Sequence, residues 1–183
     1  MPEMPVANSN RVLVLGLGND LLTDDAVGLH VARAAGARLS GDPGVVVHET
    51  MEMGLALLDE IVGFDGLVIA DSIQSGLAPP GHIHVFDQSA LASRRISAPH
   101  FVGVSETLAL GSRLGLAMPR HICLIAIEVA DPFTLARRMT SAVEQAVDTA
   151  AARAAEQAHE FMLQPALVPA LTAGTPVPPK KAA

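Results

Sequence analysis

The chain has 183 residues, of which half are apolar, and a formal net charge of −7. This length and apolar content predict one domain with a packed core, whereas nucleic acid binding would need a clustered basic surface that the sequence does not contain. The single cysteine, Cys123, excludes an internal disulfide bond and a zinc site built from cysteines.

The sequence has no apolar run near the roughly 20 residues needed to cross a bilayer. Its first ten residues carry neither the basic flank nor the apolar stretch of a signal peptide. We therefore expect a cytoplasmic protein that does not enter the membrane.

Apolar runs of strand length alternate with stretches of helical periodicity along the chain. The continuous apolar runs are typical of parallel strands buried on both faces, whereas residues 82–87 alternate as an edge strand does. In chain order, the patterns predict a strand at residues 12–17, a helix at 26–39, a strand at 45–47, a helix at 55–62, strands at 66–71 and 82–87, a helix at 101–114, a strand at 121–129 and a helix at 141–161.

Strands separated by crossover helices predict a single α/β domain, namely a three-layer αβα sandwich. We expect a mostly parallel sheet of about five strands in which residues 12–17 are central. The domain is expected to cover residues 11–164. Residues 1–10 are predicted to be flexible, as is the Pro- and Ala-rich tail at residues 165–183.

Acidic side chains follow the first three predicted strands. Asp24 and Asp25 come after the first strand, Glu49 after the second, and Asp71 closes the third. The carboxyl ends of the strands are where an open α/β sheet gathers its functional loops, so we expect these residues at one edge. His100 precedes a predicted helix and could face the same edge.

Two carboxylates and one imidazole, from Asp25, Asp71 and His100, would suit a divalent metal and leave coordination positions open for water or substrate. Each residue taken alone also has a structural interpretation. Asp25 can act as a helix N-terminal charge, and His100 can simply begin a helix. Asp71 is harder to assign to structure alone, because a carboxylate at the buried edge of a sheet needs a partner.

Two other patterns carry weaker functional signals. Gly16 and Gly18 suggest a dinucleotide loop, but the third glycine of that motif is replaced by Leu21 and the acidic loop would repel a pyrophosphate. A tight turn is the favoured interpretation. His82 and His84 point to the same side of a predicted edge strand and could chelate a metal, although a solvated edge is the simpler interpretation.

Three segments resemble the maturation endopeptidases of NiFe hydrogenases. They are VLVLGLGNDLLTDDAVGLHVA, GLVIADSI and ISAPHFVGVSETLAL, which occur in the order and at the spacing of that family. A weaker likeness continues through IAIEVADPF, so that the resemblance covers about residues 11–155.

The resemblance implies that Asp25, Asp71 and His100 are the metal-binding and catalytic residues. The implied metal is nickel, which the substrate carries and the enzyme does not hold permanently. The implied substrate is the immature large subunit of the hydrogenase, which loses the peptide C-terminal to its last cysteine motif. Contacts to this substrate are expected from the loops after the first two strands, at Gly18, Asn19, Asp24, Glu49, Thr50 and Glu52.

One segment departs from the family pattern. The family commonly carries Asp-Gly-Gly-Thr after the second strand, whereas this chain reads HETMEMG from His48 to Gly54. Glu49 can replace the acid and Gly54 a later glycine, but the central glycine pair is absent. The main alternative function is a non-enzymatic, nickel-dependent hydrogenase chaperone with the same three ligands. A generic α/β hydrolase is disfavoured because the chain has no G-x-S-x-G motif.

Overall fold

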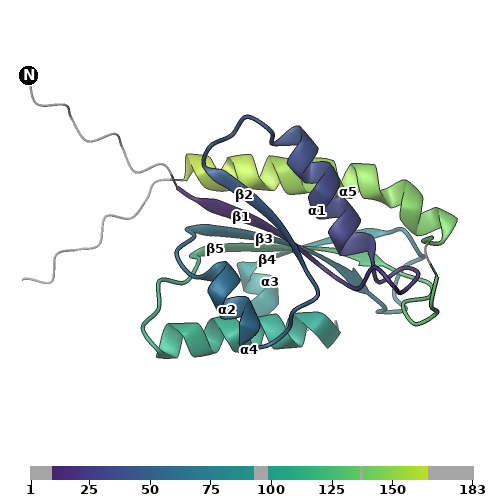
Figure 1. Cartoon of the computed structure of the whole chain (residues 1–183), viewed down its shortest axis with the longest axis horizontal. Coiled ribbons are helices and arrows are strands. Elements are labelled where there is room, and N and C mark those ends of the chain that lie inside the picture. The colour runs from purple at the N-terminus through teal and green to yellow at the C-terminus, as the bar shows by residue number, and fades with distance from the viewer. Residues whose placement is uncertain (1–9, 93–98, 137, 165–183) are drawn as a thin grey trace, which may run out of the picture.

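A computed structural model of the chain describes residues 10–92, 99–136 and 138–164, without the side chains of residues 92 and 99–102. Within these residues, strands and helices alternate as predicted (Figure 1). In chain order they are β1 (Val12–Leu17), α1 (Val27–Arg38), β2 (Val45–Thr50), α2 (Ala56–Ile61), β3 (Gly66–Ile73), β4 (Ile83–Asp87), α3 (Gln88–Ala92), α4 (Pro99–Arg113), β5 (His121–Glu128) and α5 (Ser141–Leu163).

The strands form one five-stranded sheet in the order β2-β1-β3-β5-β4. β1 pairs in parallel with β2 and β3, β3 pairs in parallel with β5, and β4 is the antiparallel edge strand. The predicted αβα fold class is therefore confirmed. β1 is an interior strand, as expected, but the middle position belongs to β3.

Successive side chains of the strands point to opposite faces of the sheet and pack into two separate cores. In β1, Val12 and Val14 face the core under α1 and α5, whereas Leu13, Leu15 and Leu17 face the core on the side of α2 and α4. Figure 1 shows α1 and α5 on one side of the sheet, with α2, α3 and α4 on the other. Because both faces of β1 and β3 are covered, their sequences are continuous apolar runs rather than alternating ones.

Two boundaries differ from the prediction in ways that affect the site, and one helix was not predicted. β3 continues two residues beyond Asp71, so Asp71 lies inside the strand and is fully buried. β2 extends to Thr50 and includes His48 and Glu49. The five-residue helix α3 was not predicted, because it is too short for a periodic pattern.

None of the described helices combines the length and apolarity needed to cross a membrane. The predicted end segments lie mostly outside the described residues, and the flexibility expected of them stays a prediction.

Candidate active site

The β1–α1 loop leaves the sheet through a glycine that no other residue could replace without strain. Gly18 has a φ of +146°, and a Cβ atom there would lie 2.0 Å from the carbonyl oxygen of Asp25. Asn19 continues the turn, since its Oδ1 accepts a hydrogen bond from the backbone N–H of Leu21 at 3.0 Å. The two residues predicted to contact substrate thus first set the path of the loop that carries Asp25.

A second glycine brings the start of α1 against the sheet. A Cβ atom on Gly28 would lie 2.1 Å from the carbonyl oxygen of Leu17 and 2.4 Å from that of Ala70. The backbone of α1 therefore touches the carboxyl ends of β1 and β3 directly. This close approach positions Asp25, three residues before Gly28, beside β3, and the sequence interpretation did not recognise it.

Ser72 links Asp25 and Asp71, because it donates a hydrogen bond to each of their carboxylates. The Ser72 hydroxyl donates a hydrogen bond to Oδ1 of Asp25 at 2.8 Å, and the Ser72 N–H donates to Oδ1 of Asp71 at 2.8 Å. All three residues are buried. The predicted proximity of the two acids at the end of the sheet is therefore present in the structure.

The Asp71 carboxyl has an unusual proton affinity. Burial raises the pKa of Asp71 well above its ordinary value; the Ser72 N–H partly opposes this rise and the charge of Asp25 adds to it. Asp71 shares the face of the sheet with Leu67, Ile69 and Ile73, which pack on the side of α2 and α4. Two acids so close together in a buried position are suited to binding a cation, which relieves both the burial cost and the mutual repulsion.

His100 lies in the first turn of α4, on the same side of the sheet as Asp71. The middle of α4 is tied to the β2–α2 loop, because Thr107 Oγ1 donates a hydrogen bond to the carbonyl oxygen of Gly54 at 2.9 Å. That loop follows the carboxyl end of β2, so α4 begins at the edge of the sheet that carries the acids. The side chain of His100 is outside the described residues, and its convergence on Asp25 and Asp71 stays a prediction. Among the side chains that are described, no three of His, Cys, Asp or Glu form a metal site without it.

Asp24 has a structural role, and its predicted contact with substrate stays a prediction. It is fully buried, and its carboxylate accepts hydrogen bonds from the backbone N–H groups of Ala130, Asp131 and Thr140 at 3.1, 3.0 and 2.7 Å. The Thr140 hydroxyl adds a fourth at 3.0 Å. Both oxygens of Asp24 thus accept hydrogen bonds from the β5–α5 loop. We call this set of hydrogen bonds the Asp24 latch.

The other residues predicted to contact substrate, in and after β2, point in different directions. Glu49 is on the α1 side of β2, together with Val45 and Val47, and forms a two-point ion pair with Arg33 of α1. It therefore faces away from the side of the sheet that carries Asp71. Thr50 is buried and its hydroxyl accepts a hydrogen bond from the N–H of Glu52 at 3.0 Å, whereas Glu52 itself is exposed in the loop. Of Glu49, Thr50 and Glu52, only Glu52 lies beyond the end of β2 with an exposed side chain.

A buried acid that sequence analysis missed closes β5. Glu128 accepts hydrogen bonds from the Ser75 hydroxyl at 2.6 Å and the Gly76 N–H at 2.8 Å, and its Oε2 lies 3.1 Å from Nε2 of His84. His84 is thus engaged with a carboxylate, while His82 beside it is exposed. The serine donates to the acid and not to the histidine, so this is a structural network rather than a nucleophile–base arrangement.

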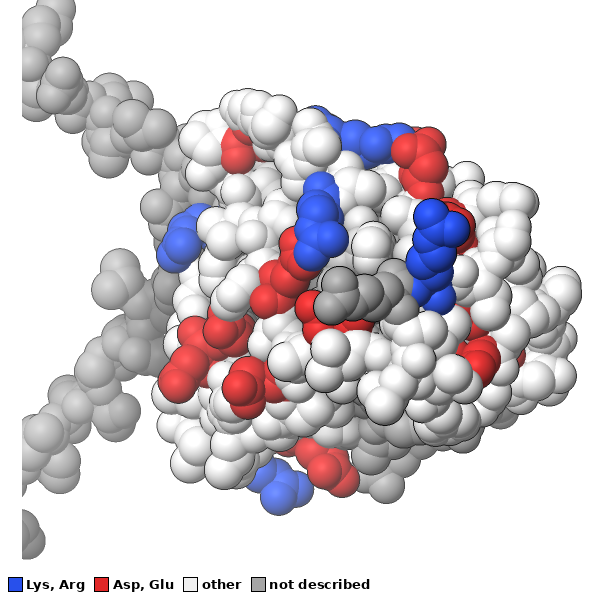
Figure 2. Space-filling view, turned by 45° about the vertical axis from the view of Figure 1, so that its right-hand side comes forward, with Lys and Arg blue, Asp and Glu red and all other residues white. Residues whose placement is uncertain are grey.

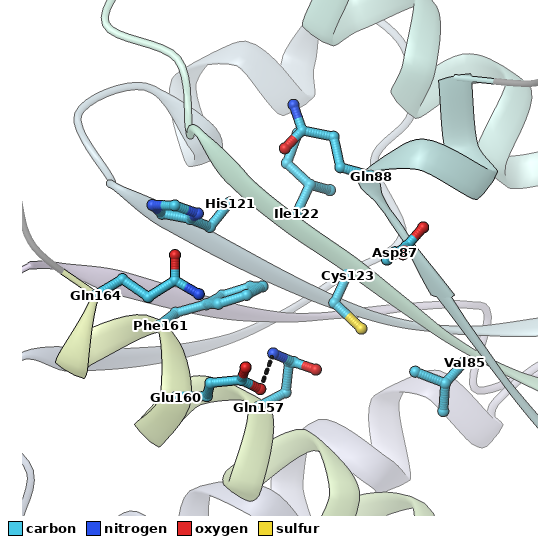
Figure 3. Close-up of a pocket in the computed structure, with 10 residues that line it drawn as sticks. All are labelled: Val85, Asp87, Gln88, His121, Ile122, Cys123, Gln157, Glu160, Phe161 and Gln164. Atoms are coloured by element: carbon cyan, nitrogen blue, oxygen red, sulfur yellow. Dashed lines mark hydrogen bonds between the residues drawn. The ribbon is translucent and has the colours of Figure 1, made fainter. Parts of the chain in front are cut away.

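A hollow of about 280 Å³ lies at the opposite end of the sheet, where β5 begins and β4 ends (Figure 3). Its lining includes His121, Phe161, and Gln157, which is hydrogen bonded to Glu160 at 2.8 Å. Cys123 also faces it, but burial raises the pKa of this thiol to about 12, with Asp87 and Glu160 adding to the effect. The raised pKa favours the protonated thiol at neutral pH, which is a poor nucleophile.

Comparison with known proteins places this geometry in a family. The family model for hydrogenase maturation proteases matches residues 30–157, which is more than half of the chain. The chain belongs to the hydrogenase maturation protease family.

Relatives of this maturation protease agree in sequence and in fold. Hydrogenase 2 maturation protease of Escherichia coli is 32% identical over 120 residues, which are 64% of this chain and 72% of the relative. The solved structure of the hydrogenase maturating endopeptidase HybD from E. coli superimposes with a TM-score of 0.68 at 26% identity, covering 82% of this chain and 93% of that one. The NiFe hydrogenase maturation protease HybD from Thermococcus kodakarensis gives a TM-score of 0.62 at 28% identity, covering 81% and 99%. These similarities support an endopeptidase over the non-enzymatic chaperone.

Proposed function

We propose that this maturation protease removes the C-terminal peptide of a NiFe-hydrogenase large-subunit precursor that already contains nickel. Asp25, Asp71 and His100 engage that nickel during the reaction. The observation that carries the proposal is the pair of buried acids joined through Ser72 at the carboxyl end of the sheet. The name of the E. coli relative, hydrogenase 2 maturation protease, supports the same class of substrate.

The donor set explains why the metal-loaded precursor is preferred. Two carboxylates and one imidazole supply three ligands, and a three-ligand site leaves coordination positions that the substrate can fill. Thiolates of the precursor are the natural ligands for those positions. A precursor without nickel forms no such bridge and is held less tightly.

Hydrolysis also needs a base that accepts the proton of the attacking water. Either carboxylate of the Asp25–Asp71 pair can serve as this base, because both lie at the same buried point. A carboxyl that keeps its proton more tightly than usual is also the better proton acceptor once ionised, and Asp71 is the residue whose pKa burial raises.

The test is a processing assay with nickel-loaded and nickel-free precursor. His100→Ala is expected to abolish cleavage of the loaded precursor while circular dichroism shows an unchanged fold. The matched control is His159→Ala, which removes an exposed histidine that pairs with Asp42 near the other end of the sheet. It should cleave at the wild-type rate.

The outcomes separate the parts of the proposal. Equal cleavage of nickel-free and nickel-loaded precursor would refute the role of nickel. Binding of the loaded precursor by the wild-type protein without any cleavage would instead favour the chaperone function.

A further inference from the structure

Three large apolar side chains are exposed on two adjoining loops beside the candidate site. Leu21 in the β1–α1 loop is 62% exposed, and Phe133 and Leu135 in the β5–α5 loop are 75% and 77% exposed. We call these three residues the apolar platform. A single exposed apolar residue is ordinary, but several on neighbouring segments are characteristic of a protein–protein contact.

The two loops are joined by backbone hydrogen bonds that hold the platform outward. The N–H and the hydroxyl of Thr23 both donate to the carbonyl oxygen of Thr134, at 2.9 and 2.7 Å. The N–H of Ala136 donates to the carbonyl oxygen of Leu21 at 3.2 Å. These bonds fix the backbone of the two loops beside the exposed side chains.

A further clamp acts within the β5–α5 loop. The Asp131 carboxylate accepts hydrogen bonds from the N–H groups of Phe133 and Thr134 at 3.1 and 3.0 Å. The Asp24 latch then fastens the base of the same loop to the residue that precedes Asp25. The platform and the candidate catalytic acid Asp25 therefore belong to one hydrogen-bonded unit.

The hydrogen bonds between the platform loops and the loop of Asp25 indicate which partner binds the platform. A protease must bring its substrate to its acids, and the platform is continuous with the loop that carries one of them. Figure 2 shows the face that comes forward when this end is turned toward the viewer, with acidic and basic side chains grouped in its upper and left parts and mostly uncharged surface below and to the right. The exposed acid Asp20 lies next to Leu21, and the exposed base Arg138 lies three residues after Leu135. Charges of both signs therefore border the platform, and an apolar segment is the complementary partner.

We infer that the apolar platform binds an apolar segment of the large-subunit precursor close to the peptide bond that is cut. This inference rests on the proposed function and adds to it the surface that recognises the protein part of the substrate, apart from its metal. Binding at the platform orients the precursor, while Asp25, Asp71 and His100 engage the nickel.

The test compares the double substitution Phe133→Ser with Leu135→Ser against the wild-type full chain. The KM for cleavage of nickel-loaded precursor and its Kd in biolayer interferometry should both rise about ten-fold or more, because large apolar side chains lose their burial. The kcat at saturating precursor should stay within about two-fold, since neither residue reaches the acids. Leu114→Ser is the matched control, because Leu114 is also 62% exposed but follows the far end of α4.

Each outcome decides the inference separately from the proposed function. A double variant that cleaves with unchanged KM and Kd overturns the platform, while wild-type cleavage still supports the proposed function. Failure of the wild type to bind or cleave the precursor overturns the proposed function itself. A wild type that dimerises in sedimentation analysis, with the double variant monomeric and its KM unchanged, would assign the platform to a second copy of the chain. If the double variant is unfolded by circular dichroism, Leu21→Ser provides the same comparison from the other loop.

Discussion

Asp71 is a fully buried acid beside a second acid, and this position is costly for the folded protein. Burial makes the ionised form of this carboxyl expensive, which is why its pKa is raised. Proteins keep such groups mainly where chemistry requires them, at the expense of stability.

Asp71→Asn should therefore separate stability from activity. Asn retains the oxygen that accepts the Ser72 N–H and removes the buried charge. Thermal unfolding should show a Tm equal to that of the wild type or higher by about 2–4 °C, which corresponds to roughly 1 kcal/mol in a domain of this size. Cleavage of nickel-loaded precursor should be lost. A clear fall in Tm would mean that the charged form of Asp71 stabilises the fold, contrary to this interpretation.

Glu128 behaves in the opposite way. Burial alone would raise the pKa of this carboxyl, but the hydrogen bonds from Ser75, the Gly76 N–H and His84 outweigh burial and leave the pKa below its ordinary value. The ionised form is thus the one that stabilises the folded protein. This contribution is complete above the pKa of the unfolded state and is lost as the pH falls through the lower pKa of the folded state.

Glu128→Gln should accordingly be destabilising in a pH-dependent manner. We expect the variant to be about 1–3 kcal/mol less stable than the wild type at pH 7 in urea unfolding, the range for a buried charged hydrogen-bond network. The difference should shrink as the pH is lowered below the ordinary value of a glutamate. Glu160→Gln, a change at an exposed residue of α5, should show no comparable trend. A pH-independent difference would show that shape rather than charge is responsible.

Sequence reasoning reached some of these residues and not others. Asp25 and Asp71 could be predicted to meet because parallel strands bring their carboxyl ends to one edge. The true role of Asp24 could not, because its hydrogen-bond donors lie 106 to 116 residues further along the chain and leave no local pattern. Glu128 was passed over because it closes an apolar run and resembles an ordinary strand end.

At the scale of elements, the contact between α1 and the sheet depends on Gly28. Its α-carbon faces two carbonyl oxygens, of Leu17 and Ala70, at distances that no Cβ atom tolerates. The sequence predicted the helix and its acidic start, but the need for a glycine at this depth follows only from the packing. The end of β3 was also not predictable from the local sequence. The polar residues Asp71 and Ser72 suggested that the strand ends there, but it continues to Ile73.

Gly28→Ala should push α1 away from the sheet and disturb the Asp25–Ser72 contact. Overpacking of this kind costs about 1–3 kcal/mol, which lowers the Tm by about 2–12 °C, and cleavage should fall with it. Gly36→Ala is the control on the same helix, since its Cβ would lie 3.5 Å from Val47, an ordinary contact. That substitution should leave the Tm unchanged or raise it, because alanine favours a helix by about 1 kcal/mol. Equal effects of both substitutions would refute the close-contact explanation.

At the scale of the whole molecule, the strands of the sheet differ in how far they are shielded from solvent. β1, β3 and β5 are interior strands with mostly buried residues, whereas β2 and β4 are the two edges and alternate in exposure. Native-state hydrogen exchange should therefore be slowest for backbone amides of β1, β3 and β5 and faster in β2 and β4. Early exchange throughout β3 would contradict the assignment of this strand as the middle of the sheet.

The layered architecture was predictable because its signal repeats along the chain. Four apolar runs, one alternating segment and the helical patterns between them all point to one sandwich, so that single errors in boundaries do not change the result. The strand order is less accessible, because the position of β3 between β1 and β5 depends on which crossovers pack best and not on any one segment.

The Asp24 latch also has a consequence for how the enzyme is made. Asp24 belongs to the first loop of the domain and its donors to the last, so the N-terminal part leaves the ribosome long before the groups that fix the loop exist. Contacts between such distant segments form late in folding, because the intervening chain must first be ordered. An unfinished or half-folded chain consequently has no fixed Asp25. The position of Asp25 is therefore expected to depend on residues 130–140, so that a chain truncated before them should fold without a fixed Asp25.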